Sequence, residues 1–196
     1  MTTENIINII TSIITCLATI TSSVLAVVAI FQTKKQIELS NKQNLFKDRV
    51  TGYLILKGLI NLYNENRKQI EEEKKEEIYF NCEFLFYEMI NNSYLEPMGE
   101  VMKSPLHNPE QKEFLKLLED LRNNAEKMEF IFEGEVAIKI KEFMLAYAEL
   151  LMELYKYRIL IDKMSEYAKS YPVVDINKAA EDMKEIDYRN RLFNCF

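Results

Sequence analysis

The chain has 196 residues and a formal net charge of −6, a length sufficient for a membrane anchor and one modest domain. All 25 Lys and Arg residues follow residue 33, together with 30 of the 31 acidic residues. This mildly acidic, mixed charge argues against a broad surface for coating nucleic acid, although it permits a local basic site. The three cysteines have no Cys-x-x-Cys spacing and do not suggest a disulfide scaffold.

An uncharged apolar segment fills the interval between Glu4 and Lys34. Its core, Ile6 to Phe31, has 26 residues, which make roughly 39 Å of α-helix. A bilayer core of about 30 Å needs about 20 residues, and helix is the only state in which this single segment satisfies its backbone in lipid. We therefore predict a transmembrane helix over 6–31. A cleavable signal peptide is disfavoured because residues 1–5 lack Lys and Arg, and a buried soluble helix is the other alternative.

Basic residues near the apolar segment predict its orientation. None precedes the segment, whereas five follow within about 20 positions, which is typical of a cytoplasmic flank. We expect a single-pass protein of the inner membrane with its N-terminus outside and its C-terminal domain in the cytoplasm. The five residues, which are also candidates for contact with lipid headgroups, are Lys34, Lys35, Lys42, Lys47 and Arg49.

The remainder of the chain is predicted to be helical, because the whole sequence holds only four Gly and four Pro. The expected fold is all-α, with one N-terminal transmembrane helix followed by a cytoplasmic helical bundle of about five helices. The expected divisions are an external tail (1–5), the transmembrane helix (6–31), a juxtamembrane helix (32–66) and the bundle (67–196). The juxtamembrane helix either continues the membrane helix or restarts at a capping box formed by Ser40 and Gln43. Its apolar residues at helical spacing are Phe46, Val50, Tyr53, Leu56, Ile60 and Tyr63.

The bundle region divides at its predicted breaks. A helix buried on several sides is expected over 78–90, after the solvated run 71–77, and an irregular stretch over 91–108. Asn108 and Pro109 cap a helix that runs to about residue 132 and ends at Gly134. A long helix follows up to a break at 170–172, and Asp175 caps a final helix that ends near Asn194. One stripe of the long helix holds Val136, Ile140, Phe143, Tyr147, Leu150, Leu154 and Arg158, and the final helix is expected to bury Ile176, Ala180, Met183 and Ile186.

Motifs of enzymes and metal sites are not recognisable in the sequence. The single histidine, His107, lies in a Pro-rich loop, no His or Cys cluster has zinc spacing, and no Gly-rich phosphate loop occurs. The acidic pairs 119–120 and 181–182 fall on helix faces that we expect to be exposed. We predict a protein that is not an enzyme and has no cofactor or metal.

Small polar side chains form a stripe along the predicted membrane helix. At 100° per residue they fall within an arc of about 120°, and Ile, Leu and Val fill the other side, where Thr21 is the polar exception. A lipid-facing helix gains nothing from such a stripe, so this face is expected to meet protein or water. The set is Asn8, Thr11, Ser12, Thr15, Thr19, Ser22 and Ser23, followed by Ala26.

Two interpretations of the polar stripe require copies of the chain to associate, and packing against a different partner protein is the third alternative. In one, small hydroxyl residues let identical helices pack closely and bond across the interface. In the other, several copies surround a narrow pore in which the hydroxyl rings hydrate passing ions. The favoured function is therefore an oligomeric pore in the membrane, and the alternative is a non-conducting anchor that carries a helical scaffold or sensor module.

A second basic and aromatic cluster lies on the long helix and is a candidate ligand site. Arg side chains with aromatic rings hold phosphate and stack bases, which would suit a nucleotide or short oligonucleotide. The alternative is a packed helix whose cations extend to solvent, with Arg158 paired to Asp162 one turn on. The candidate residues are Tyr155, Lys156, Arg158 and Lys163, with Tyr157 between them.

The run Gln36-Ile37-Glu38-Leu39-Ser40-Asn41-Lys42-Gln43-Asn44-Leu45-Phe46 resembles a juxtamembrane stretch of bacterial single-span proteins. With the whole-chain organisation, it makes the sequence similar to small membrane effectors of phage-defence operons, and most similar to the channel effector of Hailong-type defence. The resemblance implies a membrane channel held shut by DNA oligomers that a companion nucleotidyltransferase makes. It implies no particular binding residue.

Overall fold

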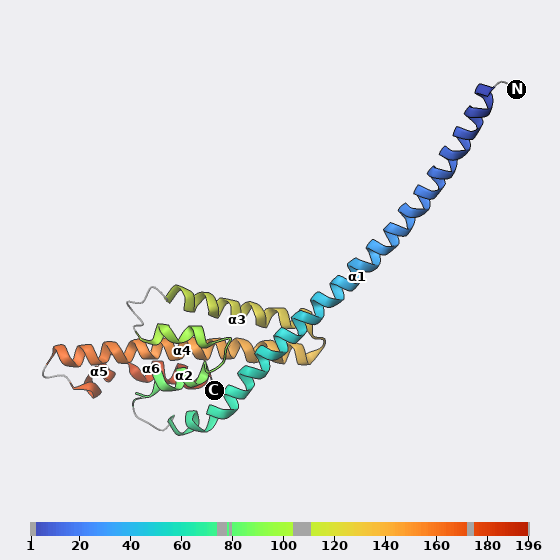
Figure 1. Cartoon of the computed structure of the whole chain (residues 1–196). Coiled ribbons are helices and arrows are strands. Elements are labelled where there is room, and N and C mark those ends of the chain that lie inside the picture. Colours follow the sequence, from blue (N-terminus) through green and yellow to red (C-terminus); the bar gives the residue numbers. More distant parts are fainter. Residues whose placement is uncertain (1–2, 74–77, 79, 104–110, 172–174, 196) are drawn as a thin grey trace. The chain divides into compact units, whose positions relative to one another are not determined.

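The structure is a computed structural model that describes residues 3–73, 78, 80–103, 111–171 and 175–195. Within these ranges the protein is helical and has no strands, so the predicted all-α class is confirmed. The elements in chain order are α1 (Thr3–Glu73), α2 (Cys82–Met89), the 3-10 helix η1 (Glu96–Lys103), α3 (Gln111–Ile131), α4 (Glu135–Ser170), α5 (Ile176–Asp182) and α6 (Glu185–Asn194) (Figure 1).

The chain divides into two compact units, residues 1–48 and residues 49–196. The described part of the first unit is helix throughout and belongs to α1, which contains the only segment of the described chain long and apolar enough to cross a membrane. Helix α1 continues without interruption through Ser40 and Gln43. The capping box therefore does not restart the helix, and the continuous alternative is the one that the structure adopts.

The second unit is built around α4, the helix of 36 residues that contacts α2, α3, α5 and α6. Helices α3 and α4 form an antiparallel pair (Figure 1). Phe114 of α3 lies at the centre of the core, with its ring 6.0 Å from Phe86 of α2 and 4.9 Å from Tyr155 of α4, measured between centroids. Burial of these rings removes large apolar areas from water and contributes to the stability of the unit.

The C-terminal third of α1 belongs to the second unit and packs through one face. Its buried residues are Gly52, Leu56, Leu59, Leu62, Asn66 and Ile70. Of the apolar positions predicted from helical spacing, Leu56 is buried and Tyr63 is half-buried, whereas Val50, Tyr53 and Ile60 are exposed. The sequence spacing therefore predicted the helix correctly, but the residues it placed on one face lie on both the buried and the exposed faces.

The predicted irregular stretch over 91–108 contains an ordered element that was not predicted from the sequence. The side chain of Asn92 accepts hydrogen bonds from the backbone N–H groups of Tyr94 and Leu95 at 3.0 and 2.8 Å, which starts a turn. Helix η1 follows and buries Met98, Val101 and Met102. Residues 104–110, which include His107 and the predicted Asn108–Pro109 cap, lie outside the described residues.

The predicted single helix after Asp175 is wrong, because it is divided into α5 and α6. Lys184 adopts a left-handed backbone with φ of 55°, which ends one helix and starts the other. This break turns Ile186 outward, where it is 48% exposed, although we expected it to be inside. Two neighbouring predictions are confirmed: α4 ends at Ser170, and Asp175 caps α5, where its side chain accepts a hydrogen bond from the Lys178 N–H at 2.8 Å.

Candidate functional site

The polar stripe on the first unit is built from hydroxyl groups that bond to their own helix. The hydroxyls of Thr11, Thr15 and Thr19 each donate to the carbonyl oxygen four residues earlier, at 2.8 to 2.9 Å. Ser22 and Ser23 do the same at 2.8 Å. Because these bonds use the hydroxyl hydrogens, each oxygen keeps its remaining acceptor capacity for whatever meets the helix surface.

The middle of the stripe is hollowed into a shallow groove on the surface of α1. Its lining residues are Thr11, Ser12, Thr15, Cys16, Thr19 and Ile20. Thr33 was missed as a further member of the stripe, although it falls in the same 120° arc at 100° per residue. Its hydroxyl donates to the Ala29 carbonyl at 2.8 Å, as the other threonines do. Thr21, on the apolar side, also bonds inward, to the Leu17 carbonyl at 2.8 Å.

The predicted membrane-surface cations do not all have the same environment. Lys34, Lys35, Lys42 and Lys47 are exposed residues of the first unit. Lys42 forms an ion pair with Glu38 at 2.8 Å, one turn earlier. Arg49 belongs to the second unit, where its Nε–H donates to the Ile131 carbonyl at 3.0 Å and caps the last turn of α3. Arg49 therefore has a structural partner in addition to the surface role predicted for it.

The candidate ligand cluster on α4 is dispersed by the packing of that helix. Tyr155 is buried against Phe114, and Tyr157 is fully buried with its hydroxyl donating to Glu185. Lys156 forms an ion pair with Glu153, while Lys163 is exposed. Neither tyrosine ring presents a free face for base stacking in this arrangement, which corresponds to the packed-helix alternative.

Arg158 links two helices through two carboxylates. Its guanidinium lies 3.3 Å from Asp162, the partner predicted from the sequence, and 3.1 Å from Glu83 of α2. Cys82, next to Glu83, is fully buried, and burial is the largest cause that raises the pKa of its thiol to about 12. Cys82 is therefore a protonated core thiol and has little nucleophilic character.

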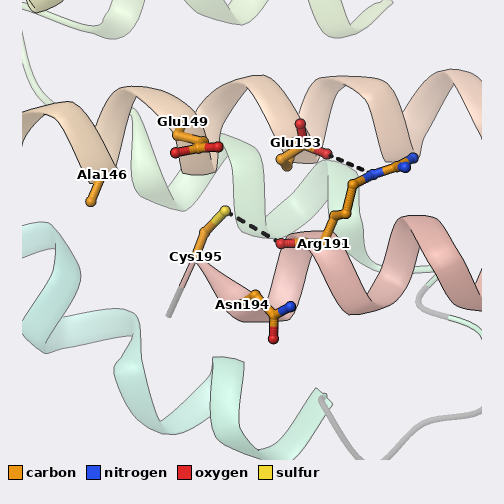
Figure 2. A pocket seen from close by; sticks show the side chains of 6 residues that line it. All are labelled: Ala146, Glu149, Glu153, Arg191, Asn194 and Cys195. Carbon is orange, nitrogen blue, oxygen red and sulfur yellow. Dashed lines mark hydrogen bonds and ion pairs between the residues drawn. The ribbon is translucent and has the colours of Figure 1, made fainter.

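A cleft between α4 and α6 was not predicted from the sequence. Figure 2 shows Glu149 and Glu153 of α4 on one side and Arg191 and Cys195 on the other. Its two sides come from segments at least 38 positions apart in the chain, so no local sequence motif predicts it. Among the described residues, no group of three or more His, Cys, Asp or Glu side chains has an arrangement that would hold a metal ion.

Comparison with protein-family models, with curated proteins and with solved structures finds no match to this chain.

Proposed function

We propose that this protein is a self-associating membrane effector whose N-terminal helices line a gated, ion-conducting pore in the bacterial inner membrane. The observation that carries the proposal is the continuous polar stripe of the first unit. A single helix in lipid would expose this stripe to hydrocarbon, so association that covers the stripe, or hydrates it, is favourable.

The hydroxyl geometry favours a lining that coordinates cations. The hydroxyl groups of Thr11, Thr15 and Thr19 donate their hydrogens to carbonyl oxygens of the same helix. The hydroxyl oxygens therefore remain available as outward-facing acceptors. Rings of such oxygens from several copies would replace part of the hydration shell of a passing ion. Asn8 extends the same face toward the N-terminal end of the helix, and Ser12 lies on it between Thr11 and Thr15.

Control of the pore is assigned to the second unit, which holds most of the chain. The resemblance to phage-defence effectors suggests a nucleotide or short oligonucleotide as the regulator, with a companion nucleotidyltransferase as its source. The dispersed cluster around Tyr155 adds no geometric support for that particular binding surface.

The pore is tested by recording currents from the full-length protein in planar bilayers. Thr15→Leu and Thr19→Leu place apolar side chains on the stripe and should reduce conductance at least tenfold. Thr21→Leu is the matched control, because Thr21 has the same inward hydroxyl bond but lies on the apolar side of the helix. Wild-type currents in both stripe variants, or equal losses in the control, would contradict the proposal.

A non-conducting scaffold is the second candidate function, and the same hydroxyl bonds favour it. Since the hydroxyl groups of Thr15 and Thr19 already donate hydrogen bonds within the helix, this side of the helix can pack against another copy without water between them. Cys16, which lines the groove, offers a test through oxidative crosslinking in membranes. Crosslinked dimers that carry no current, in a protein that leaves the membrane potential intact when expressed, would favour the scaffold.

A further inference from the structure

The cleft between α4 and α6 continues into a second, apolar depression beside the C-terminal third of α1. The first depression has a volume of about 300 Å³ and the second of about 220 Å³, and both are lined by Ala146 and Cys195. The pair therefore forms one elongated cleft. Its size is at the lower end of the range for sites that hold small organic molecules.

The α4–α6 half of the cleft presents two carboxylates of α4, and one of them is already paired with cations of the protein. Glu149 is exposed, and Glu153 is 8% exposed with ion pairs to Lys156 and to Arg191 at 3.7 Å (Figure 2). The pKa of the Cys195 thiol is raised to about 11, first by burial and then by the charges of Glu149 and Glu153. Burial is the largest of these causes, and the positive charge of Lys156 acts in the opposite direction to the two carboxylates.

The other half of the cleft is apolar and aromatic. Tyr63 of α1 meets Phe143 of α4 edge to face, with ring centroids 6.2 Å apart, and Leu150 and Tyr147 complete the wall. The Tyr147 hydroxyl points away into the core, where it donates to the Met89 carbonyl at 2.6 Å. The wall therefore offers ring faces and aliphatic carbon to an occupant.

We propose that this cleft binds a small organic cation with an apolar body. Its ammonium group lies between Glu149 and Glu153, and its ring or alkyl chain lies against Tyr63, Phe143 and Leu150. An ammonium group brings three donors to carboxylate oxygens, and aromatic walls also attract cations.

Arg191 is the side chain that moves away from Glu153 when the cation binds. Its contact with Glu153 is long, at 3.7 Å, and its side chain is 54% exposed, so it can turn to solvent while the ligand takes its place. Its guanidinium also lies 4.3 Å from the centre of the Tyr188 ring, a contact that does not require the ion pair with Glu153. This binding activity goes beyond the proposed pore and does not depend on it.

The test measures binding of benzylamine to the full chain in lipid nanodiscs by ligand-observed NMR and titration calorimetry, with empty nanodiscs subtracted. Benzyl alcohol and benzoate have the same ring but are neutral and anionic. Saturable binding of benzylamine, at least tenfold tighter than that of either analogue, is the expected result. Absence of saturation, or equal binding of benzyl alcohol, would overturn the proposal.

Three variants locate the binding. Glu149→Gln removes the charge of one of the two carboxylates, and Ala146→Leu fills the point that both depressions share; both positions are exposed on α4, so the fold should be retained. Each should weaken benzylamine binding at least fivefold. Glu166→Gln is the control, because Glu166 is an exposed acid of α4 outside the cleft. Unchanged affinity in the two cleft variants, or an equal loss in the control, would contradict the assignment.

Discussion

The guanidinium of Arg158 lies 3.1 Å from the carboxylate of Glu83 and joins α4 to α2. The side chains of the pair are 23% and 34% exposed, so both charges are only partly hydrated. Asp162 lies 3.3 Å from the same guanidinium. A cation on an otherwise apolar stripe is thus neutralised by one local and one distant carboxylate.

Removal of that cation should destabilise the second unit. Arg158→Met keeps the stem of the side chain but leaves Glu83 and Asp162 without their partner, and we expect a loss of about 1–2 kcal/mol in the free energy of unfolding. Urea titration of the full chain in detergent, followed by near-UV circular dichroism, measures the change. Lys163→Met, at an exposed position of the same helix, should have little effect. A double-mutant cycle with Glu83→Gln should give a coupling of about 0.5–1.5 kcal/mol, and zero coupling would refute the link.

The buried thiol of Cys82 should make stability fall at high pH. Its pKa in the folded protein is raised to about 12 from the usual 9.0, chiefly by burial. The unfolded chain therefore loses this proton first, so the stabilisation is complete below pH 9 and is lost as pH rises toward 12. The slope contributed by one thiol is about 1.4 kcal/mol per pH unit.

The Cys82→Ala variant checks the origin of that slope. Stability curves measured between pH 8 and pH 11 should be flatter in the variant than in the wild type, whatever its absolute stability. A thiol reagent added to the folded protein at pH 8 should leave Cys82 unmodified until urea is added, because the side chain is fully buried. Modification in the folded state would show that the environment of Cys82 is misassigned.

Gly52 should tolerate a methyl group but not a larger side chain. A Cβ atom at this position would lie 2.8 Å from the Met128 Cε and 3.2 Å from its Sδ, both in a flexible side chain. Gly52→Ala gains about 1 kcal/mol of helix propensity, which should offset the shift of Met128. Gly52→Leu should cost about 1–3 kcal/mol through overpacking. Thermal unfolding of both variants measures these changes in stability. In a Met128→Ala background, the loss caused by Gly52→Leu should be smaller, because space for the leucine side chain is available. A leucine variant as stable as the alanine variant would contradict the close contact with Met128.

The N-terminal cap of α5 should contribute measurably to stability. Asp175→Ala removes the acceptor of the Lys178 N–H and should cost about 1 kcal/mol, whereas Asp175→Asn retains an acceptor and should cost less than half as much. Amide hydrogen exchange over 176–182 reports the local effect. Equal exchange rates in the two variants would show that the cap oxygen has no energetic role.

Features that depend on residues within one or two turns were predictable. Asp175 as a cap, the break after Ser170 and the Arg158–Asp162 pair each rest on a spacing of four residues or fewer, and all three are confirmed. The break at Lys184 was not predictable in this way, because a lysine in the left-handed region has no sequence signal comparable to glycine. The 3-10 helix over Glu96–Lys103 was missed because a proline near its start suggested only an irregular segment.

The sequence by itself determined that the chain is helical, that one N-terminal segment is long and apolar enough to span a membrane, and that small hydroxyl residues follow one face of it. These properties follow from the composition and period of single helices, which need no partner to be recognised. Only the tertiary structure decided which face of α1 is buried beyond Arg49, that Glu83 is the second partner of Arg158, and that Glu149 and Cys195 line one cleft. Each of these depends on side chains brought together by packing of distant segments, and no periodicity within one helix carries that information.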